Sequence, residues 1–133
     1  MMYDQLFPMA QLNLALGWIW IIGGFCSGAL LGMGFHKSDF LGGYASFRRR
    51  LLRLGHIAFF GTGILNLLFV GTVILLGWDG PSAFAAGIAF ALGALAMPLC
   101  CGLVAWKTAL KPLFALPVIS LMTAGILTCM EIL

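Results

Sequence analysis

Four long stretches of this chain contain no charged residue, and they limit the structures that it can form. The first lies between Asp4 and Lys37, the second between Arg53 and Asp79, the third between Asp79 and Lys107, and the fourth between Lys111 and Glu131. Each stretch is long enough to cross the roughly 30 Å hydrocarbon core of a bilayer as a helix. Helices satisfy their own backbone in lipid, and the stretches lack the alternation of barrel strands. The sequence therefore predicts an all-α integral membrane protein.

The composition agrees with a chain that is embedded in lipid. Of its 133 residues, 62% are hydrophobic and 8% are charged, with a mean hydropathy of +1.10, which is far from soluble composition. No connecting segment is long enough to bury a core of its own. We therefore predict one transmembrane domain over residues 1–133, a four-helix bundle with helices at about 12–35, 46–78, 82–106 and 112–130.

The Lys and Arg residues set the expected orientation. All seven lie in two regions, one between the cores of the first and second helices and one between those of the third and fourth. The positive-inside rule makes both regions cytoplasmic, and it places both termini outside together with Asp4, Asp79 and Glu131. We expect the bacterial cytoplasmic membrane as the location. The net charge of +3 then reflects a basic membrane rim, and it gives no reason to expect binding of nucleic acid.

The densest charge in the chain lies at the start of the second helix. Four arginines occur within six positions, Arg48, Arg49, Arg50 and Arg53. Arginines beside a transmembrane helix extend to the interface and contact lipid headgroups. We predict that these four bind headgroups and fix the topology, with a site for an acidic partner or a specific lipid as the alternative.

Small residues recur at every fourth position in two of the predicted helices. They are Gly24, Gly28 and Gly32 in the first, and Ala85, Ala89 and Gly93 in the third. This spacing puts each set on one helix face, where another helix can approach closely. We predict contacts within the bundle, with other membrane subunits or with a second copy of the chain. A ligand groove is the alternative.

Two features inside the predicted helices need partners. Thr62 and Asn66 lie one turn apart on one face of the second helix, and we predict an interhelical hydrogen bond there, with a polar permeation route as the alternative. Pro98 deprives the carbonyl of Ala94 of its usual backbone donor. We predict a static bend that neighbouring groups satisfy, with a hinge as the alternative.

The two histidines, His36 and His56, flank the first basic loop. Two imidazoles from facing helices are the axial ligands that a b-type haem uses, so we take this pair as a candidate haem site. We expect the histidines to bond headgroups, water or carbonyls at the interface, and the haem site is the alternative. The four cysteines form no CxxC motif, and we expect apolar filling from them and no metal site.

The pattern of residues points away from catalysis. The sequence contains no nucleophile and base pair, carboxylate pair or phosphate loop, and no Asp or Glu lies near the middle of a helix. We therefore expect a non-catalytic accessory or structural subunit of a larger membrane complex, of the respiratory or energy-converting kind, within which a haem could also be bound. The alternative is a small homodimeric channel or carrier for a small solute or ion.

Overall fold

Four long apolar helices make up most of the chain. The computed structural model describes residues 3–133, with side chains from residue 8 onward. The helices are α1 (Tyr3–Gly34), α2 (Phe47–Leu76), α3 (Pro81–Trp106) and α4 (Ala115–Ile132), and two 3-10 helices, η1 (Phe40–Gly42) and η2 (Thr108–Phe114), lie in the connections. Within the described residues, four helical segments are long and apolar enough to cross a membrane. The predicted all-α bundle of four helices of membrane-spanning length is confirmed.

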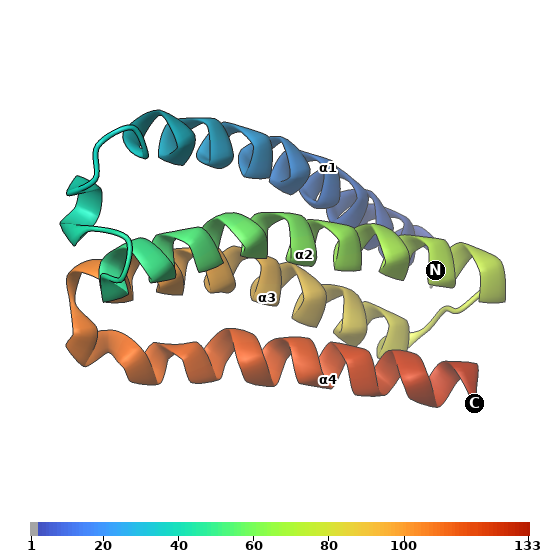
Figure 1. Cartoon of the computed structure of the whole chain (residues 1–133). Coiled ribbons are helices and arrows are strands. Elements are labelled where there is room, and N and C mark those ends of the chain that lie inside the picture. The colour runs from blue at the N-terminus through green and yellow to red at the C-terminus, as the bar shows by residue number, and fades with distance from the viewer. Residues whose placement is uncertain (1–2) are drawn as a thin grey trace.

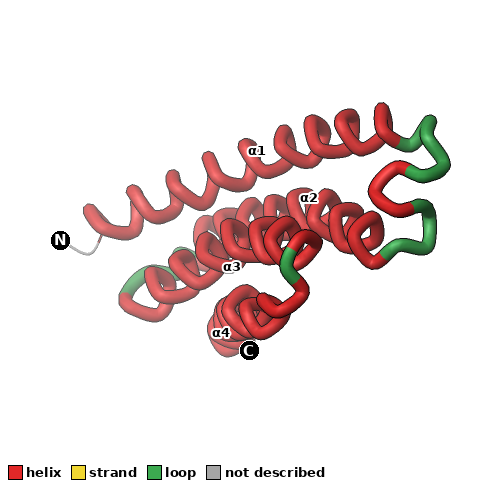
Figure 2. Tube along the Cα trace, turned by 90° about the vertical axis from the view of Figure 1, so that its left-hand side faces the viewer, coloured by secondary structure: helices red, strands yellow, loops and turns green. Residues whose placement is uncertain are grey.

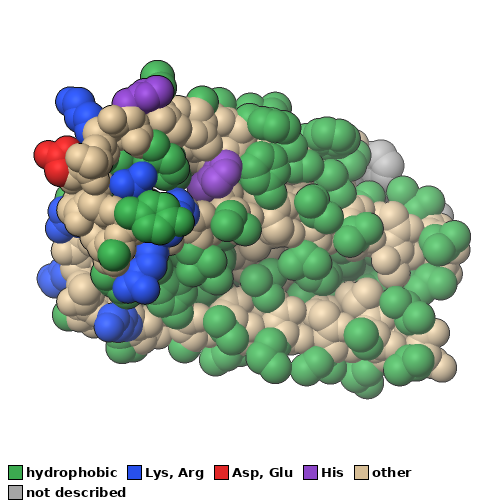
Figure 3. All heavy atoms as spheres, viewed as in Figure 1, with side chains coloured by type: hydrophobic (Ala, Val, Ile, Leu, Met, Phe, Trp, Pro, Cys, Tyr) green, Lys and Arg blue, Asp and Glu red, His purple; other side chains and the backbone are tan. Residues whose placement is uncertain are grey.

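The helices run alternately in opposite directions. Both termini therefore lie at one end of the bundle, and η1 and η2 lie at the other (Figure 1). The main contacts join α1 to α2, α2 to α3, and α3 to α4, with α1 and α4 on opposite sides of the inner pair (Figure 2). The Lys and Arg side chains gather at the end that carries η1 and η2 (Figure 3), which we call the basic end.

Local signals set the ends of the two inner helices. Ser46 caps α2, and its hydroxyl oxygen accepts a hydrogen bond of 3.1 Å from the backbone nitrogen of Arg49. Gly77 ends α2 in the left-handed conformation, with φ 60° and ψ 30°. Pro81 occupies the first turn of α3. Both helices begin and end within two residues of the predicted positions.

The outer helices differ more from the prediction. The helix α1 begins at Tyr3 and not near residue 12, and it includes Pro8. Hydropathy predicted a later start because it identifies apolar segments, and the first turns of α1 also contain polar residues. The residues before α4 form the 3-10 helix η2, and the α-helix begins at Ala115. Pro117 then lies in the first turn of α4, where an α-helix has no backbone acceptor for an N–H group.

The best-buried helix is α3. In its most apolar window 56% of the residues are buried, compared with 11% for the windows of α1 and α4. Its alanines let α2 and α4 approach closely, and Ala83, Ala86 and Ala94 are fully buried. The aromatic rings of Phe69 and Phe90 pack 5.4 Å apart between α2 and α3. The core therefore lies around α3, and most of the surface of α1 and α4 is apolar and exposed.

The glycine series of the first helix lies partly against α2. A Cβ atom at Gly24 would lie 2.7 Å from the ring of Phe60. One at Gly28 would lie 2.6 Å from the ring of His56. Gly32 has no neighbour of this kind within 4 Å. Two of the three glycines therefore make room for side chains of the same chain.

The small residues of the third helix lie toward α4. Gly93 adjoins the side chain of Leu121, and a Cβ would not fit between them. The hydroxyl of Ser120 donates a 3.0 Å hydrogen bond to the carbonyl oxygen of Ala89. Ala85 lines a shallow pocket between the two helices. This series therefore forms the surface on which α4 packs.

A close backbone approach between α1 and α2 occurs at a pair of glycines outside the predicted series. A Cβ at Gly63 would lie 2.9 Å from the carbonyl oxygen of Gly17 and 3.1 Å from Cβ of Trp20. Backbone atoms cannot move away at low cost, so a side chain at Gly63 would separate the helices.

Two neighbouring glycines of α2 test this contact. We expect Gly63→Ala to lower the free energy of unfolding by about 1–3 kcal/mol, as overpacking does. The matched variant Gly61→Ala should be neutral or stabilising, because a Cβ there meets nothing within 4 Å and alanine favours helix. Reversible unfolding in mixed micelles measures both variants. Equal effects of the two substitutions would contradict the contact between Gly17 and Gly63.

Candidate functional site

A buried amide pair joins three helices near the end of the bundle that carries the termini. The Nδ2 atom of Asn13 donates to Oδ1 of Asn66 at 2.7 Å and to the carbonyl oxygen of Gly87 at 2.9 Å. The Nδ2 atom of Asn66 donates to the carbonyl oxygens of Thr62 at 2.8 Å and Phe90 at 3.3 Å. Both asparagine side chains are fully buried. The pair therefore links α1, α2 and α3.

The partner of Asn66 was not identified from the sequence. Asn13 lies at the edge of the predicted first span, where a polar residue is also compatible with the interface. The hydroxyl of Thr62 donates to the carbonyl oxygen of Ala58 at 2.6 Å, within its own helix. The Oδ1 atom of Asn13 has no hydrogen-bond partner among the described residues. The amide pair contributes to helix association, and bonds of this kind are worth about 0.6–2 kcal/mol in membranes.

In two places, the carbonyl that lies four residues before a proline has a side-chain donor from another helix. The indole Nε1 of Trp20 in α1 donates to the carbonyl oxygen of Ala94 at 2.7 Å, which is the group that Pro98 leaves without a backbone donor. The thiol of Cys100 in α3 lies 3.5 Å from the carbonyl oxygen of Leu113, four residues before Pro117. The carbonyl freed by Pro98 is thus satisfied by a donor from another helix.

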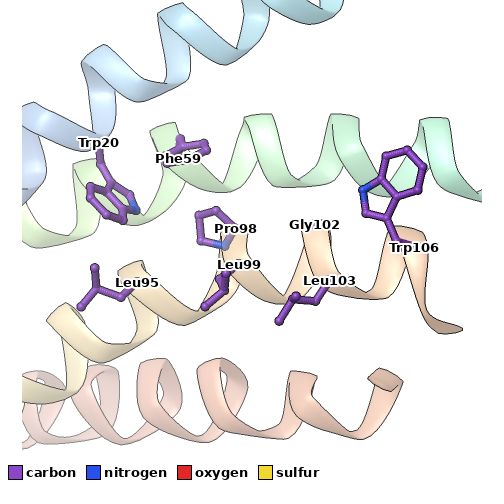
Figure 4. A pocket seen from close by; sticks show the side chains of 8 residues that line it. All are labelled: Trp20, Phe59, Leu95, Pro98, Leu99, Gly102, Leu103 and Trp106. Carbon is purple, nitrogen blue, oxygen red and sulfur yellow. The ribbon is translucent and has the colours of Figure 1, made fainter. Parts of the chain in front are cut away.

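An apolar groove runs along α3 toward the basic end. Its volume is about 500 Å³, and its lining residues are Trp20, Phe59, Leu95, Pro98, Leu99, Gly102, Leu103 and Trp106. Figure 4 shows Trp20 toward one end and Trp106 at the other, with Pro98 and Gly102 between them. The lining contains no ionisable side chain. The groove therefore suits a hydrocarbon chain better than a polar solute.

A smaller pocket of about 220 Å³ shares Phe59, Pro98 and Gly102 with this groove and adds Ser27 and His56. Both pockets therefore border the same part of the surface between α1, α2 and α3. The shared residues make the pocket of His56 a side branch of the groove.

Ser27 of α1 is a hydrogen-bond partner of His56 in α2. The hydroxyl of Ser27 donates to the carbonyl oxygen of Gly24 at 3.0 Å, and its oxygen lies 3.0 Å from Nδ1 of His56. Whether Nδ1 donates or accepts in the second bond depends on the tautomer of the ring. A hydrogen bond to one ring nitrogen is a common feature of histidines that bind a metal through the other.

The two predicted haem ligands have different surroundings. His36 is exposed in the turn after α1 and is absent from the lining of the pocket that contains His56. The two histidine side chains appear as separate patches on the surface (Figure 3). His56 therefore lies in a pocket within the bundle, whereas His36 lies at its edge. Haem binding by the pair stays a prediction.

The arginines at the start of α2 contact aromatic rings at the basic end. The guanidinium carbon of Arg48 lies 4.2 Å from the ring centre of Trp106, and its Nε donates to the carbonyl oxygen of Ala105 at 3.2 Å. Arg49 is only 7% exposed and lies 4.3 Å from the ring of Phe35. Its Nε has no hydrogen-bond partner among the described residues. Stacking of this kind fixes the cations while they keep their charge.

Two further cations of this end lie at a greater distance from aromatic rings. Arg53 lies 5.0 Å from the ring of Tyr44, and Lys111 lies 5.2 Å from the ring of Phe47. Arg50 is exposed. The four predicted headgroup residues are therefore not equivalent, because Arg49 is buried against a ring, Arg48 is exposed beside a ring, and Arg50 is exposed.

The hydrogen bond between Trp20 and the carbonyl of Ala94 can be tested by replacing Pro98, because Pro98 deprives this carbonyl of its usual backbone donor. We expect Trp20→Phe to destabilise the protein, because loss of the donor leaves a buried carbonyl unsatisfied at about 1–3 kcal/mol. In a Pro98→Ala background the same change should cost less, since alanine at this position restores a backbone donor. A double-mutant cycle of unfolding free energies in mixed micelles measures this coupling. Additive effects would show that Trp20 does not act through this carbonyl.

Comparison with known proteins gives no further guide to the role of these features. No protein-family model, curated protein or solved structure matches the chain.

Proposed function

We propose that this integral membrane protein is a non-catalytic accessory subunit of a larger membrane complex, oriented with its basic end in the cytoplasm and both termini outside. The polar groups of its interior support this role. Asn13 and Asn66 bond each other and backbone carbonyls, and Trp20 bonds Ala94. These groups stabilise the bundle, so a polar permeation route along Asn66 would require breaking its bonds.

The outward face of α2 is the observation that carries the proposal. Exposed residues recur there at alternating intervals of three and four, Leu54, Ile57, Gly61, Ile64, Leu68, Gly71 and Leu75. This is the seven-residue repeat of a helix that packs against another helix along a seam. Gly61 and Gly71 have no neighbours within 4 Å where a Cβ would be. We call this set the α2 seam.

A transmembrane helix is the occupant that such a seam fits. Apolar area alone does not favour a protein neighbour over lipid, but a regular repeat with open glycines allows close interhelical contact. One turn before Leu54 the same seam reaches Arg50, which is exposed. Two parallel copies paired along this seam would bring their Arg50 side chains together, and like charges oppose that pairing. A helix of another subunit with an acidic residue at that level avoids this repulsion.

The test is purification of the tagged protein from its native membranes in mild detergent. We expect stoichiometric membrane subunits with the wild-type chain and a loss of at least about tenfold with Gly61→Leu, which fills the seam. Gly125→Leu is the matched control, because Gly125 in α4 is equally open and lies outside the seam. A clean monomer in several gentle detergents would contradict the proposal. A homodimer that carries solute flux in proteoliposomes would favour the channel or carrier instead.

The haem hypothesis fits inside this function and has its own test. If both histidines ligate haem b, the reduced protein shows Soret and alpha bands that disappear in both His36→Ala and His56→Ala. Ser27→Ala removes the hydrogen-bond partner of Nδ1 of His56 and should shift the bands or weaken haem retention. A featureless spectrum after expression with added haem would contradict haem binding. That result would leave the proposed docking role intact.

A further inference from the structure

The length of the apolar groove matches one leaflet of a bilayer. Its lining follows α3 from Leu95 to Trp106, which is about 16 Å along the helix axis at the rise of an α-helix. The hydrocarbon core is about 30 Å thick, so the groove extends from near the middle of the core to its basic surface. Trp106 is 64% exposed at that surface, where tryptophan is enriched in membrane proteins.

A cation is fixed at the end of the groove. Arg48 stacks on Trp106, the last lining residue, and bonds the carbonyl oxygen of Ala105. Arg48 also lies on the groove side of α2, because about three helical turns separate it from Phe59 in the lining. The guanidinium has further N–H groups that can donate to an anion. The groove is therefore apolar along its length and cationic at its mouth.

The charge of the basic end is poorly balanced within the chain. The two basic connecting segments with the start of α2 contain seven Lys and Arg residues and one acidic residue, Asp39. Arg48 at the mouth of the groove is one of these seven cations, and its contact with Trp106 leaves it exposed. An anion beside such a cation gains charge-assisted hydrogen bonds. An occupant of the groove should therefore carry negative charge at this end.

We propose that the groove binds one anionic phospholipid of the leaflet at the basic end. Its acyl chain lies along Leu95, Pro98 and Gly102, and its phosphate accepts hydrogen bonds from Arg48. Phosphatidylglycerol and phosphatidylcholine share this phosphate, but the neighbouring arginines repel the choline cation. Headgroups with a net negative charge are thus preferred over zwitterionic ones.

This site is separate from the α2 seam. Phe59 of the groove and Gly61 of the seam are two residues apart and therefore about 200° apart around α2. Lipid binding and subunit docking can thus be disrupted independently. A failure of one proposal leaves the other unaffected.

Native mass spectrometry of the detergent-solubilised protein tests the site. The probes are phosphatidylglycerol and phosphatidylcholine with identical acyl chains, supplied in equal amounts. We expect the wild-type chain to retain more phosphatidylglycerol, and Arg48→Gln to reduce this preference about fivefold. Arg48→Lys keeps the charge and should retain most of the preference. The matched control Arg50→Gln removes one exposed cation from another face of α2 and should leave it unchanged.

A second pair of variants tests the groove itself. Gly102→Leu fills the groove, and it should be compatible with the fold because a Cβ at Gly102 meets nothing within 4 Å. It should lower retention of both lipids, whereas Gly125→Leu in α4 should not. Equal effects of Arg48→Gln and Arg50→Gln would show diffuse charge attraction and overturn the proposal. Unchanged retention in Gly102→Leu would overturn it as well.

Discussion

A backbone carbonyl that has lost its helical donor finds no water inside a bilayer, and this constraint organises the bundle. Pro98 creates such a carbonyl at Ala94, and Trp20 of α1 supplies the missing donor. Asn13 and Asn66 add hydrogen bonds to backbone groups of α2 and α3. The interhelical polar bonds thus form where a helix is interrupted or where a polar side chain is buried. They give directional specificity that apolar contacts in lipid do not provide.

The sequence predicted the number and approximate positions of the helices because charge and hydropathy are local properties. It predicted that Asn66 and the carbonyl of Ala94 need partners, since an unsatisfied polar group in lipid is costly wherever it lies. It did not identify Asn13 and Trp20 as those partners. Choosing a donor requires the relative position and rotation of two helices, and these depend on contacts such as Gly17 with Gly63. The local sequence shows that a polar group requires a hydrogen-bond partner, whereas the identity of that partner depends on the tertiary structure.

The spacing of small residues identified helix faces but not their neighbours. Gly24 and Gly28 make room for side chains of α2 within the same chain. The glycines that remain open on α2, Gly61 and Gly71, are too far apart to be found by a search at every fourth position. They become visible as a seam only when exposure is known for each residue. The two sides of α2 consequently differ, with an internal contact surface on one and an exposed repeat on the other.

The bonds of α1 have a consequence for the order in which the chain can be assembled during synthesis. Asn13 and Trp20 are translated before α3, and each has an acceptor on α3 that follows 74 residues later. Asn13 can bond Asn66 of α2 before α3 is made, whereas the acceptor of Trp20, the carbonyl oxygen of Ala94, becomes available only with α3. The last helix carries no such dependence on α1, because α4 packs on α3. The helices α1 and α2 can therefore pair first, their bonds to α3 form later, and α4 can join last.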